Sequence, residues 1–426
     1  MSDVSKTLRR RPRLLLYTES TLIGGAERYL YDIACRMSEH CDVRVGCNPD
    51  AALLEYLEPL RRDIAIDVLP VFTVGGSAAF QLSQRAGINR VRQLQIVRKV
   101  GDAAVRVAHR GPNIAILRRW LLQHRPDILH INAPAYPGLE SCRAAVIAAA
   151  LTQTPVVGMF VHTQATARRW PAIEEAAFDQ LIGKYLDTVL VASSASADAL
   201  VYRRGFPRRQ ITCIPNGVVV PSLSHACSAM ERRALGLPEE GMLIGVVGRL
   251  DTNKGQGYLL EAAAIVRRQI EDVHVVVVGE GPCESQYREQ ATRLGLADGA
   301  IFTGYRRDVL ELMRAFDILV MPTVDYEALG YVLLEAMSVG VPVIGTRVGG
   351  IPEIVHHGLT GLLVPPHDVP ELAGALLRLL SDPVERRRLG QAARTRIEAD
   401  FSMDTMVART LKHYIQLLDA ARSGVA

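Results

Sequence analysis

Short apolar runs alternate with longer amphipathic segments along the whole chain. The runs are rich in Val, Ile and Leu and almost uninterrupted by polar residues, which is typical of strands buried on both faces of a sheet. In the first half of the chain we expect strands at Leu14–Tyr17, Val43–Cys47, Val68–Val71, Ile128–Asn132, Val156–Val161 and Val189–Ala192. In the second half we expect them at Leu243–Val247, His274–Val278, Ile301–Thr303, Ile318–Met321, Val343–Gly345 and Gly361–Val364. Helical segments between consecutive strands indicate βαβ units, so the pattern predicts an α/β fold with parallel sheets.

The length of the chain and a change of composition near its middle indicate two domains. The chain has 426 residues, and a single core stops growing at roughly 250–300 residues. Residues 211–241 are rich in Pro, Ser and Gly, so we interpret them as a linker between two Rossmann-like domains. The expected boundaries are 1–218, with a basic helical insert at about 78–125, then 219–400, and a helix over 401–426 that packs back on the first domain. A ligand would lie in a central cleft, at the carboxyl ends of the strands.

Composition excludes several classes of protein. The 49% hydrophobic and 22% charged residues are ordinary for a soluble globular protein. The apolar run Leu14–Tyr17 is too short for a signal peptide, and Thr, Gln and Pro155 interrupt the apolar residues 144–161. We therefore expect a cytoplasmic protein without a membrane span. The seven cysteines have no spacing typical of a metal site, so we interpret them as small buried residues and predict no metal.

Two glycine-rich turns follow predicted strands, at residues 22–30 and 246–260. Glycines let the backbone approach a phosphate closely, and the amides at the start of the next helix favour an anion. Neither turn matches the G-x-G-x-x-G fingerprint of dinucleotide-binding proteins or a Walker P-loop. Arg249 and Lys254 flank the second turn, and two cations there could hold a diphosphate without a metal ion.

The stretch VDYEALGYVLLEAM, residues 324–337, places Glu335 inside an apolar run. A buried carboxylate needs a partner, which either the protein or a ligand supplies. We expect a helix that starts near Ala328, with Glu327 just before it and Glu335 about two turns inside, about 12 Å away. The amides of Ala328, Leu329 and Gly330 would then favour negative charge between the two acids. In this arrangement a carboxylate at each end could bind hydroxyl groups, and the amides between them could bind an anion. A ligand made of a sugar, a diphosphate and a ribose has this pattern of groups.

With these pieces in order, the chain resembles the retaining glycosyltransferases of family 4, which have the GT-B fold. Glu327 and Glu335 lie at the E-x7-E spacing of that family. The segment that contains them, residues 321–355, matches as a whole. The other matching segments of the second half are VVGRLDTNKG (246–255), VVGEGPCE (277–284), FTGYRRDV (302–309) and GLTGLLVPPHD (358–368). In the first half they are GGAERYLYDIACRM (24–37), VHTQA (161–165) and PNGV (215–218). The usual Glu-Gly-Phe-Gly start of the motif is Glu-Ala-Leu-Gly here, which leaves the identity of the sugar open.

The resemblance implies that the second domain binds a nucleotide-sugar donor, such as a UDP- or GDP-sugar. Arg249 and Lys254 would bind the donor diphosphate and stabilise it as the leaving group. Glu335 would take the ribose hydroxyls, and the amides from Ala328 to Gly330 would belong to the donor site.

Glu327 and His162 are implied as the catalytic residues. Glu327 would hold hydroxyls of the transferred sugar, and His162, at the end of a first-domain strand, would hydrogen-bond that sugar. Gly25 would let the first loop close over the phosphates and the acceptor. The implied reaction is transfer to a glycan or lipid-linked glycan with retention of configuration, without a cofactor, in cell-surface polysaccharide or glycolipid synthesis.

The segment 80–125 is strongly basic, with nine Arg and one Lys against a single acid. Arg85, Arg92, Lys99 and Arg106 recur every seven residues and would form one stripe on a helix. Such a helix could lie on an anionic membrane, at the inner face of the plasma membrane, or pack on the first domain with a solvated Arg face. Binding of nucleic acid is not expected, because no stacking aromatics are interleaved with the charges.

Two alternatives to a glycosyltransferase stay open. A non-hydrolysing sugar-nucleotide epimerase shares the two-domain fold, and analysis of the product would distinguish it. A non-catalytic donor-binding subunit of an assembly complex would bind the nucleotide without transfer. The sequence leaves the nucleotide base, the acceptor, the linkage and the oligomeric state undetermined.

Overall fold

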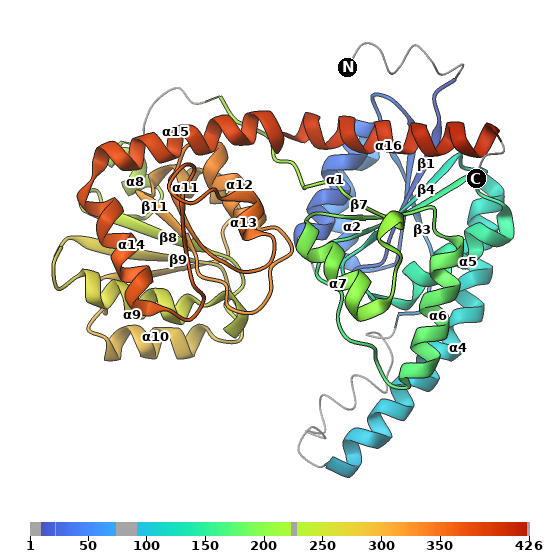
Figure 1. The fold of residues 1–426 in the computed structure, drawn as a ribbon, viewed down its shortest axis with the longest axis horizontal. Helices are drawn as coiled ribbons and strands as arrows, with labels where there is room; N and C mark the ends of the chain where they lie inside the picture. The colour runs from blue at the N-terminus through green and yellow to red at the C-terminus, as the bar shows by residue number, and fades with distance from the viewer. Residues whose placement is uncertain (1–9, 22, 74–91, 223–227, 424–426) are drawn as a thin grey trace. The chain divides into compact units, whose positions relative to one another are not determined.

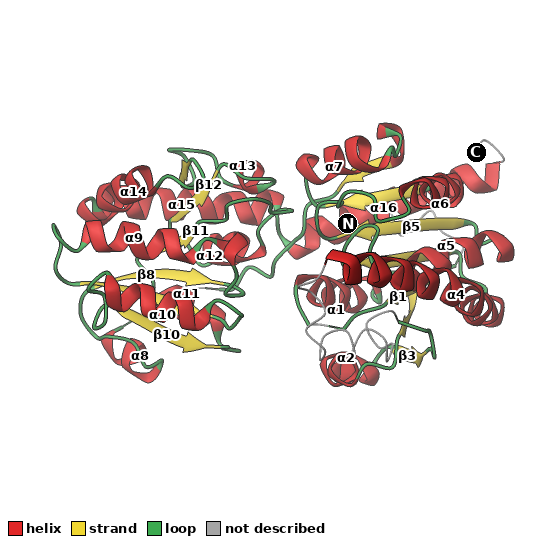
Figure 2. Ribbon diagram, turned by 90° about the horizontal axis from the view of Figure 1, so that it is seen from below, coloured by secondary structure: helices red, strands yellow, loops and turns green. Residues whose placement is uncertain are grey.

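The computed structural model describes residues 10–21, 23–73, 92–222 and 228–423, with no account of the side chains of residues 92–100. The chain divides into two compact units (Figure 1). The N-terminal unit comprises Met1–Ile214 and Met406–Ala426, and the C-terminal unit comprises Pro215–Thr405. Each unit is built on its own parallel sheet with helices on both faces (Figure 2). The two-domain α/β architecture predicted from the apolar runs is therefore confirmed.

The N-terminal unit contains a seven-stranded sheet in the order β3-β2-β1-β4-β5-β6-β7. Its strands are β1 (Arg13–Thr18), β2 (Asp42–Cys47), β3 (Ala65–Val68), β4 (Ile128–Ala133), β5 (Val156–Val161), β6 (Thr188–Val191) and β7 (Ile211–Cys213). All neighbours are parallel, so the carboxyl ends of the strands share one edge. Two strands differ from the prediction: β3 lies three residues earlier than expected, and β7 lies in the segment interpreted as a linker. Both are short strands at the edges of the sheet, where one neighbour is missing and the apolar signal is weak.

Helices cover both faces of this sheet. They are α1 (Gly25–Met37), α2 (Ala51–Leu57), η1 (Glu58–Arg62), α4 (Arg92–His124), α5 (Glu140–Thr152), α6 (Ala172–Tyr185), α7 (Ser194–Arg204) and η3 (Arg208–Gln210). One continuous apolar core joins α4, α5, α6 and α7 to one face of the sheet. On the other face, the ring of Tyr29 from α1 lies 4.4 Å from the ring of Phe160 on β5. Local signals set the ends of α7: the side chain of Ser193 accepts a hydrogen bond from the amide of Ser196, and Gly205 ends the helix with φ of +80°.

The C-terminal unit contains a six-stranded parallel sheet in the order β10-β9-β8-β11-β12-β13. Its strands are β8 (Met242–Val247), β9 (Val273–Val278), β10 (Ala300–Gly304), β11 (Ile318–Met321), β12 (Val343–Thr346) and β13 (Leu362–Val364). Its helices are α8 (Ala229–Ala234), η4 (Thr252–Lys254), α9 (Gln256–Val266), α10 (Glu284–Arg293), α11 (Val309–Ala315), α12 (Tyr331–Ser338), α13 (Ile351–Ile354), α14 (Val369–Ser381) and α15 (Pro383–Asp400). Each strand lies within one residue of its predicted position, because the runs are strongly apolar and all but the edge strand β10 are largely buried.

The chain passes between the units twice, and the two passing segments are paired. Val218 donates its amide to the carbonyl of Phe401, and Met403 donates its amide to the carbonyl of Val218, both at 2.9 Å. A Cβ on Gly217 would overlap the backbone of Ser402 and Met403, so only glycine fits there. The last helix, α16 (Met403–Ser423), starts in the C-terminal unit and continues as part of the N-terminal unit from Met406.

The basic helix α4 is oriented differently from the prediction. Of the four cations of the predicted stripe, Arg85 lies outside the described residues, and the side chains of Arg92 and Lys99 are likewise not described. Arg106 is buried, with 6% of its surface exposed, and donates from Nη2 to the carbonyl of Trp170 at 2.9 Å. The same helical periodicity predicts that Ala104 and Ala108 lie on an apolar side opposite the stripe, but both are exposed. A partner carbonyl distant in sequence thus draws Arg106 into the interior.

Candidate functional site

Two loops at the carboxyl ends of β8 and β11 bring a predicted cation and a predicted acid together. Nζ of Lys254 lies 2.7 Å from Oε2 of Glu327, and both side chains are largely buried, with 30% and 14% exposed. The two residues are 73 positions apart in sequence. The structure therefore places a diphosphate-binding candidate beside a sugar-binding candidate, already joined as an ion pair.

Asn253 locks these two loops to each other. Its Oδ1 accepts the amides of Asp325 and Tyr326, each at 3.1 Å, and its Nδ2 donates to the carbonyl of Tyr326 at 3.0 Å. Gly255, with φ of +71°, ends the first loop, and a Cβ there would overlap the carbonyl of Pro322. The contact between Lys254 and Glu327 therefore rests on a rigid backbone frame. Asn253 was not among the residues predicted from the sequence, although a side-chain amide inside the glycine-rich turn was a signal for such a role.

Glu335 is buried, with 9% of its surface exposed, as its apolar neighbours predicted. The predicted start of its helix is wrong, since α12 begins at Tyr331 rather than near Ala328. Gly330 precedes the helix with φ of +106°, which a residue in the first turn of a helix cannot have. Only four residues of helix precede Glu335, so the distance of about 12 Å, which assumed eight helical residues, does not apply.

The amides that were expected at the helix start lie in the loop before it. Leu329 is buried, with 2% of its surface exposed, and the amide of Ala328 contacts Oε1 of the preceding Glu327 at 3.1 Å. The carbonyl of Glu327 accepts the amide of Gly350 at 3.0 Å, which fixes this loop from its other side. Glu327 therefore lies in a loop that is held by the loops following β12 and β8, and it does not cap a helix.

Arg249 follows β8 and is an exposed residue of the second glycine-rich turn. Its side chain is 60% exposed, and Nε lies 3.9 Å from Oδ2 of Asp251. Its backbone is held instead, because Nε2 of Gln256 donates to the carbonyl of Arg249 at 2.9 Å. A long exposed guanidinium on a fixed backbone can reorient toward an anion.

In the N-terminal unit, His162 follows β5 and contacts the end of β4. Nε2 of His162 lies 2.6 Å from Oδ1 of Asn132, whose Nδ2 donates to the carbonyl of Ala26 at 3.1 Å. Because Nδ2 of Asn132 is the donor, Oδ1 accepts, and Nε2 of His162 carries the proton. Burial, with the nearby His130, lowers the pKa of His162 to about 3. The imidazole is neutral at neutral pH, and Nδ1 is its acceptor.

Two aromatic rings hold His162 in place, one stacked on it and one edge-on. Its ring lies 4.5 Å from that of Phe160 and 4.8 Å from that of Tyr29. Gly25 is the first residue of α1, where the side chain of Glu27 accepts the amide of Gly24 at 2.8 Å. Tyr29 belongs to the same helix, so the glycine-rich turn and His162 are connected through α1.

Metal ligands do not gather in the part of the chain that the structure describes: no three His, Cys, Asp or Glu side chains there could hold a metal ion together. None of the helices within the described ranges has the length and apolar character that a bilayer-spanning helix requires.

Comparison with protein families matches both halves of the chain. Residues 23–220 match the model described as Glycosyltransferase Family 4, and residues 228–396 match the model described as Glycosyl transferases group 1. A GDP-mannose-dependent alpha-(1-6)-phosphatidylinositol monomannoside mannosyltransferase of Mycobacterium tuberculosis is 31% identical over 324 residues, 73% of this chain and 82% of that protein. A phosphatidyl-myo-inositol mannosyltransferase of Mycobacterium leprae is 31% identical over 64% of this chain and 69% of that protein.

Solved structures share the fold. Anabaena Alr3699/HepE, in complex with UDP, superposes with a TM-score of 0.74 at 23% identity, over 95% of this chain and all of that one. A glycosyltransferase from Rickettsia africae superposes with a TM-score of 0.76 at 17% identity, over 96% and 99% of the two chains. The two parallel-sheet units are those of the GT-B fold.

Proposed function

The chain belongs to the family 4 glycosyltransferases, and from that premise we propose that it transfers a sugar from a nucleotide-diphosphate-sugar to an acceptor hydroxyl with retention of configuration. The observation that carries this proposal is the pair of Lys254 and Glu327 on locked loops at the carboxyl edge of the C-terminal sheet. The ends of parallel strands are where α/β folds bind their ligands.

The ion pair suggests how the donor enters. Donor phosphates compete with Glu327 for Lys254, because phosphate oxygens carry more charge than one carboxylate. Once Lys254 turns to the diphosphate, Glu327 becomes available for hydroxyls of the sugar. Arg249 joins from its exposed position, and Glu335 takes the ribose hydroxyls. The cations stabilise the leaving diphosphate, so we propose a reaction that needs no metal ion.

His162 acts as a hydrogen-bond acceptor in this proposal. Its protonated Nε2 is directed to Asn132, which leaves Nδ1 to accept from a sugar hydroxyl. A group with a pKa of about 3 is not a proton donor at neutral pH, so His162 positions the sugar rather than protonating the leaving group.

Relatives guide the choice of substrates. The Mycobacterium tuberculosis relative is named for GDP-mannose and a phosphatidylinositol mannoside, and the Anabaena structure holds UDP. We therefore propose a UDP- or GDP-sugar as donor and a glycan or lipid-linked glycan as acceptor, in glycolipid or surface-polysaccharide synthesis. We propose that the protein is cytoplasmic and makes peripheral contact with the inner face of the membrane.

A thermal-shift series with UDP-, GDP- and ADP-sugars tests donor binding. A donor at a hundredfold excess over its Kd stabilises the folded unit by about 2.7 kcal/mol, which corresponds to a rise of roughly 5–10 °C in Tm for a unit of this size. The rise should disappear in Lys254→Ala and persist in Arg293→Ala, a matched loss of an exposed cation on α10. Equal shifts in both variants would contradict the assigned site.

Turnover then separates the alternatives. With an acceptor present, NMR of the product should show the donor's anomeric configuration, whereas an epimerized nucleotide-sugar would indicate an epimerase. Donor binding without any transfer would indicate a non-catalytic subunit. Glu335→Ala should raise the donor KM, and Glu327→Ala should mainly lower kcat.

A further inference from the structure

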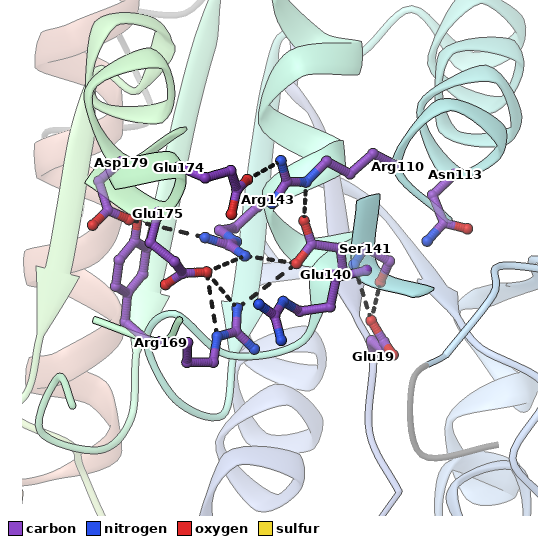
Figure 3. A network of polar contacts seen from close by, with 12 residues as sticks. Glu19, Arg110, Asn113, Glu140, Ser141, Arg143, Arg169, Glu174, Glu175 and Asp179 are labelled. Carbon is purple, nitrogen blue, oxygen red and sulfur yellow. Dashed lines mark hydrogen bonds and ion pairs between the residues drawn. The ribbon is translucent and has the colours of Figure 1, made fainter. Parts of the chain in front are cut away.

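Helix α6 turns its acidic side chains toward the interior of the N-terminal unit (Figure 3). Its three acids are Glu174, Glu175 and Asp179. The side chains of Glu175 and Asp179 are 0% and 2% exposed, and both lie at Nη1 of Arg204 on α7, at 2.9 and 3.1 Å. Glu174 is bound by Nη1 of Arg110 on α4. Each acid of α6 is therefore paired with an arginine of a neighbouring helix.

Glu175 keeps its charge inside the unit. Burial alone would raise the pKa of Glu175, but Arg143 and Arg169 lower it to about 2. Nη2 of Arg143 and Nη2 of Arg169 each lie 3.1 Å from Oε1 of Glu175. The inner side of α6 thus carries an ionised carboxylate among arginines, beside the buried apolar side chains of Phe178 and Ile182.

The solvent side of α6 is mostly apolar. Ile173, Ala177, Leu181 and Tyr185 follow one another at intervals of four residues, so they form one row along the helix. The three large side chains of this row, Ile173, Leu181 and Tyr185, are 87%, 41% and 38% exposed. Trp170, just before the helix, is 52% exposed and extends the row at its start. We call these five residues the apolar row.

This arrangement is the reverse of the one expected for a surface helix. A helix at the surface of a globular protein normally buries its apolar stripe and exposes its charges. Buried ion pairs cost desolvation energy, and an exposed apolar row leaves hydrophobic surface in water. An exposed apolar surface of this kind is typical of a contact with an apolar partner.

Exposed cations lie at the C-terminal end of the apolar row. Lys184 of α6 is exposed, as are Arg208 and Arg209 of η3. Nε2 of Gln210 donates to the carbonyl of Gly183 at 2.6 Å, which holds η3 beside this end of α6. Within the described ranges, none of the three cations is paired with a carboxylate. Their charge is therefore available to a partner outside the chain.

The composition of this surface fits an anionic membrane. Tryptophan and tyrosine prefer the level of the lipid headgroups, and Trp170 and Tyr185 lie at the two ends of the apolar row. The stem of Lys184 can follow apolar surface while its ammonium group stays among the headgroups. Cations close to an anionic membrane surface add electrostatic attraction. Apolar contact and charge therefore favour the same partner.

A protein partner fits the apolar row less well. A stable protein–protein interface buries about 800 Å² on each partner. Even a fully buried aromatic side chain contributes only about 150–250 Å², so the partly exposed side chains of the row supply on the order of half of that area. A bilayer needs no second shaped surface, because an interfacial helix binds by burying its apolar face at the boundary of headgroups and acyl chains.

We propose that the apolar row of α6 inserts into the headgroup region of an anionic membrane, with Lys184, Arg208 and Arg209 against the lipid headgroups. This inference rests on the proposed function, since it names the surface that makes the peripheral membrane contact. Helix α6 follows the loop that starts at His162. Membrane contact through α6 thus brings the loop of a candidate catalytic residue close to a lipid-linked acceptor.

The fluorescence of Trp170 tests this contact directly. Of the two tryptophans of the chain, Trp120 is buried, so a response to vesicles comes from Trp170. The full-length protein is titrated with vesicles of phosphatidylcholine and phosphatidylglycerol. We expect a saturable blue shift of the emission, and quenching when the acyl chains are brominated. Vesicles of phosphatidylcholine alone should bind more weakly. Emission that does not respond to the anionic vesicles would overturn the proposal.

Variants of exposed side chains assign the apolar row. Ile173→Ser combined with Leu181→Ser should weaken partitioning into anionic vesicles at least about tenfold in a flotation assay, because two apolar side chains then stay in water. Met230→Ser combined with Val384→Ser removes two exposed apolar side chains of the C-terminal unit and should leave partitioning unchanged. All four side chains lie at the surface, so the cores of both double variants stay intact. Equal partitioning of the two double variants would contradict the assignment.

Charge variants assign the cations. Replacing Lys184, Arg208 and Arg209 together by glutamine should remove the preference for anionic over neutral vesicles. Replacing Arg293 and Arg387, two exposed arginines of the C-terminal unit, by glutamine should leave that preference in place. A preference that persists in the first variant would show that the three cations do not face the membrane.

Light scattering and donor binding, measured in parallel, keep the proposals apart. If the Ile173 and Leu181 double variant changes the oligomeric state and the parent protein does not bind vesicles, the apolar row covers a second copy and the inference is wrong. If a nucleotide-sugar is bound and turned over but vesicles are not bound, the membrane inference alone is wrong. If vesicles are bound as expected but no nucleotide-sugar is bound, the membrane surface stands and the proposed function is wrong.

Discussion

The contact between Gly158 and Tyr414 predicts a large effect of a single methyl group. Gly158 lies within β5, and a Cβ built there would overlap the phenol of Tyr414 from α16. Tyr414 is 1% exposed, and its Oη lies 2.6 Å from Nδ1 of the buried His130. Gly158→Ala should therefore displace the last helix from the sheet of the N-terminal unit.

The magnitude follows from two terms. Overpacking by one methyl group in a dense core costs about 1–3 kcal/mol. Loss of the hydrogen bond between Tyr414 and His130 costs about 0.5–1.5 kcal/mol. We expect Gly158→Ala to lower the free energy of unfolding of the N-terminal unit by about 2–4 kcal/mol. Gly101→Ala on α4 is the matched control, because no atom lies within 4 Å of its Cβ position. It should be neutral or stabilise by up to about 1 kcal/mol.

Urea denaturation followed by tryptophan fluorescence measures this effect in the right unit, since both tryptophans belong to the N-terminal unit. A double-mutant cycle with Tyr414→Phe adds a second criterion. The phenylalanine removes Oη, the atom closest to the new methyl group, so the double variant should be less destabilised than the sum of the single variants. An unchanged midpoint for Gly158→Ala, or strict additivity, would refute the packing argument.

Further predictions concern pH and backbone conformation. Burial lowers the pKa of His130 and of His162 from 6.5 to about 3, so both imidazoles are neutral in the folded protein. As pH falls from 6.5 toward 3, each histidine should therefore lower the stability of the N-terminal unit by about 1.4 kcal/mol for every pH unit. The midpoints of urea denaturation in a pH series would measure this slope. Glu19 has the opposite dependence: its folded pKa is raised from 4.5 to about 7, so it stabilises at low pH and loses this contribution as pH rises through 7. Glu19→Gln should therefore gain stability relative to the parent as pH rises from about 4.5 to about 7, and a constant difference over that range would contradict the raised pKa. Gly255→Ala should cost about 2–4 kcal/mol in the C-terminal unit, from the left-handed φ and the overlap with the carbonyl of Pro322; a thermal melt with a matched Gly374→Ala control, where the Cβ position is open, checks it.

The strands were predictable because parallel sheets covered on both faces need long apolar runs, and such runs are visible in the sequence. The same reasoning found Glu335, since a carboxylate within an apolar helix is conspicuous. It failed at the start of α12, because the positive φ of Gly330 depends on the loops around it and not on its sequence neighbours. It also failed for β7, whose three residues carry little apolar signal.

Pairings between distant residues were the part that the sequence could not supply. Arg106 was assigned to a solvated or membrane-facing stripe because helical periodicity takes water as the default partner of a cation. Its actual partner is a carbonyl 64 residues away. Lys254 and Glu327 show the same limit, since each was assigned to a ligand and each is paired with the other.

That second pairing has a consequence for the proposed chemistry. Forming the donor complex would break an ion pair of 2.7 Å between two largely buried side chains, and removing one partner of such a pair leaves a charge without compensation. Glu327→Gln should therefore release Lys254 and tighten the binding of the nucleoside diphosphate alone, while lowering turnover of the complete nucleotide-sugar. Calorimetric titration of UDP and GDP into the variant, compared with the parent, measures the first effect. Weaker binding of the diphosphate would show that Glu327 supports the cation rather than competing with the phosphates for it.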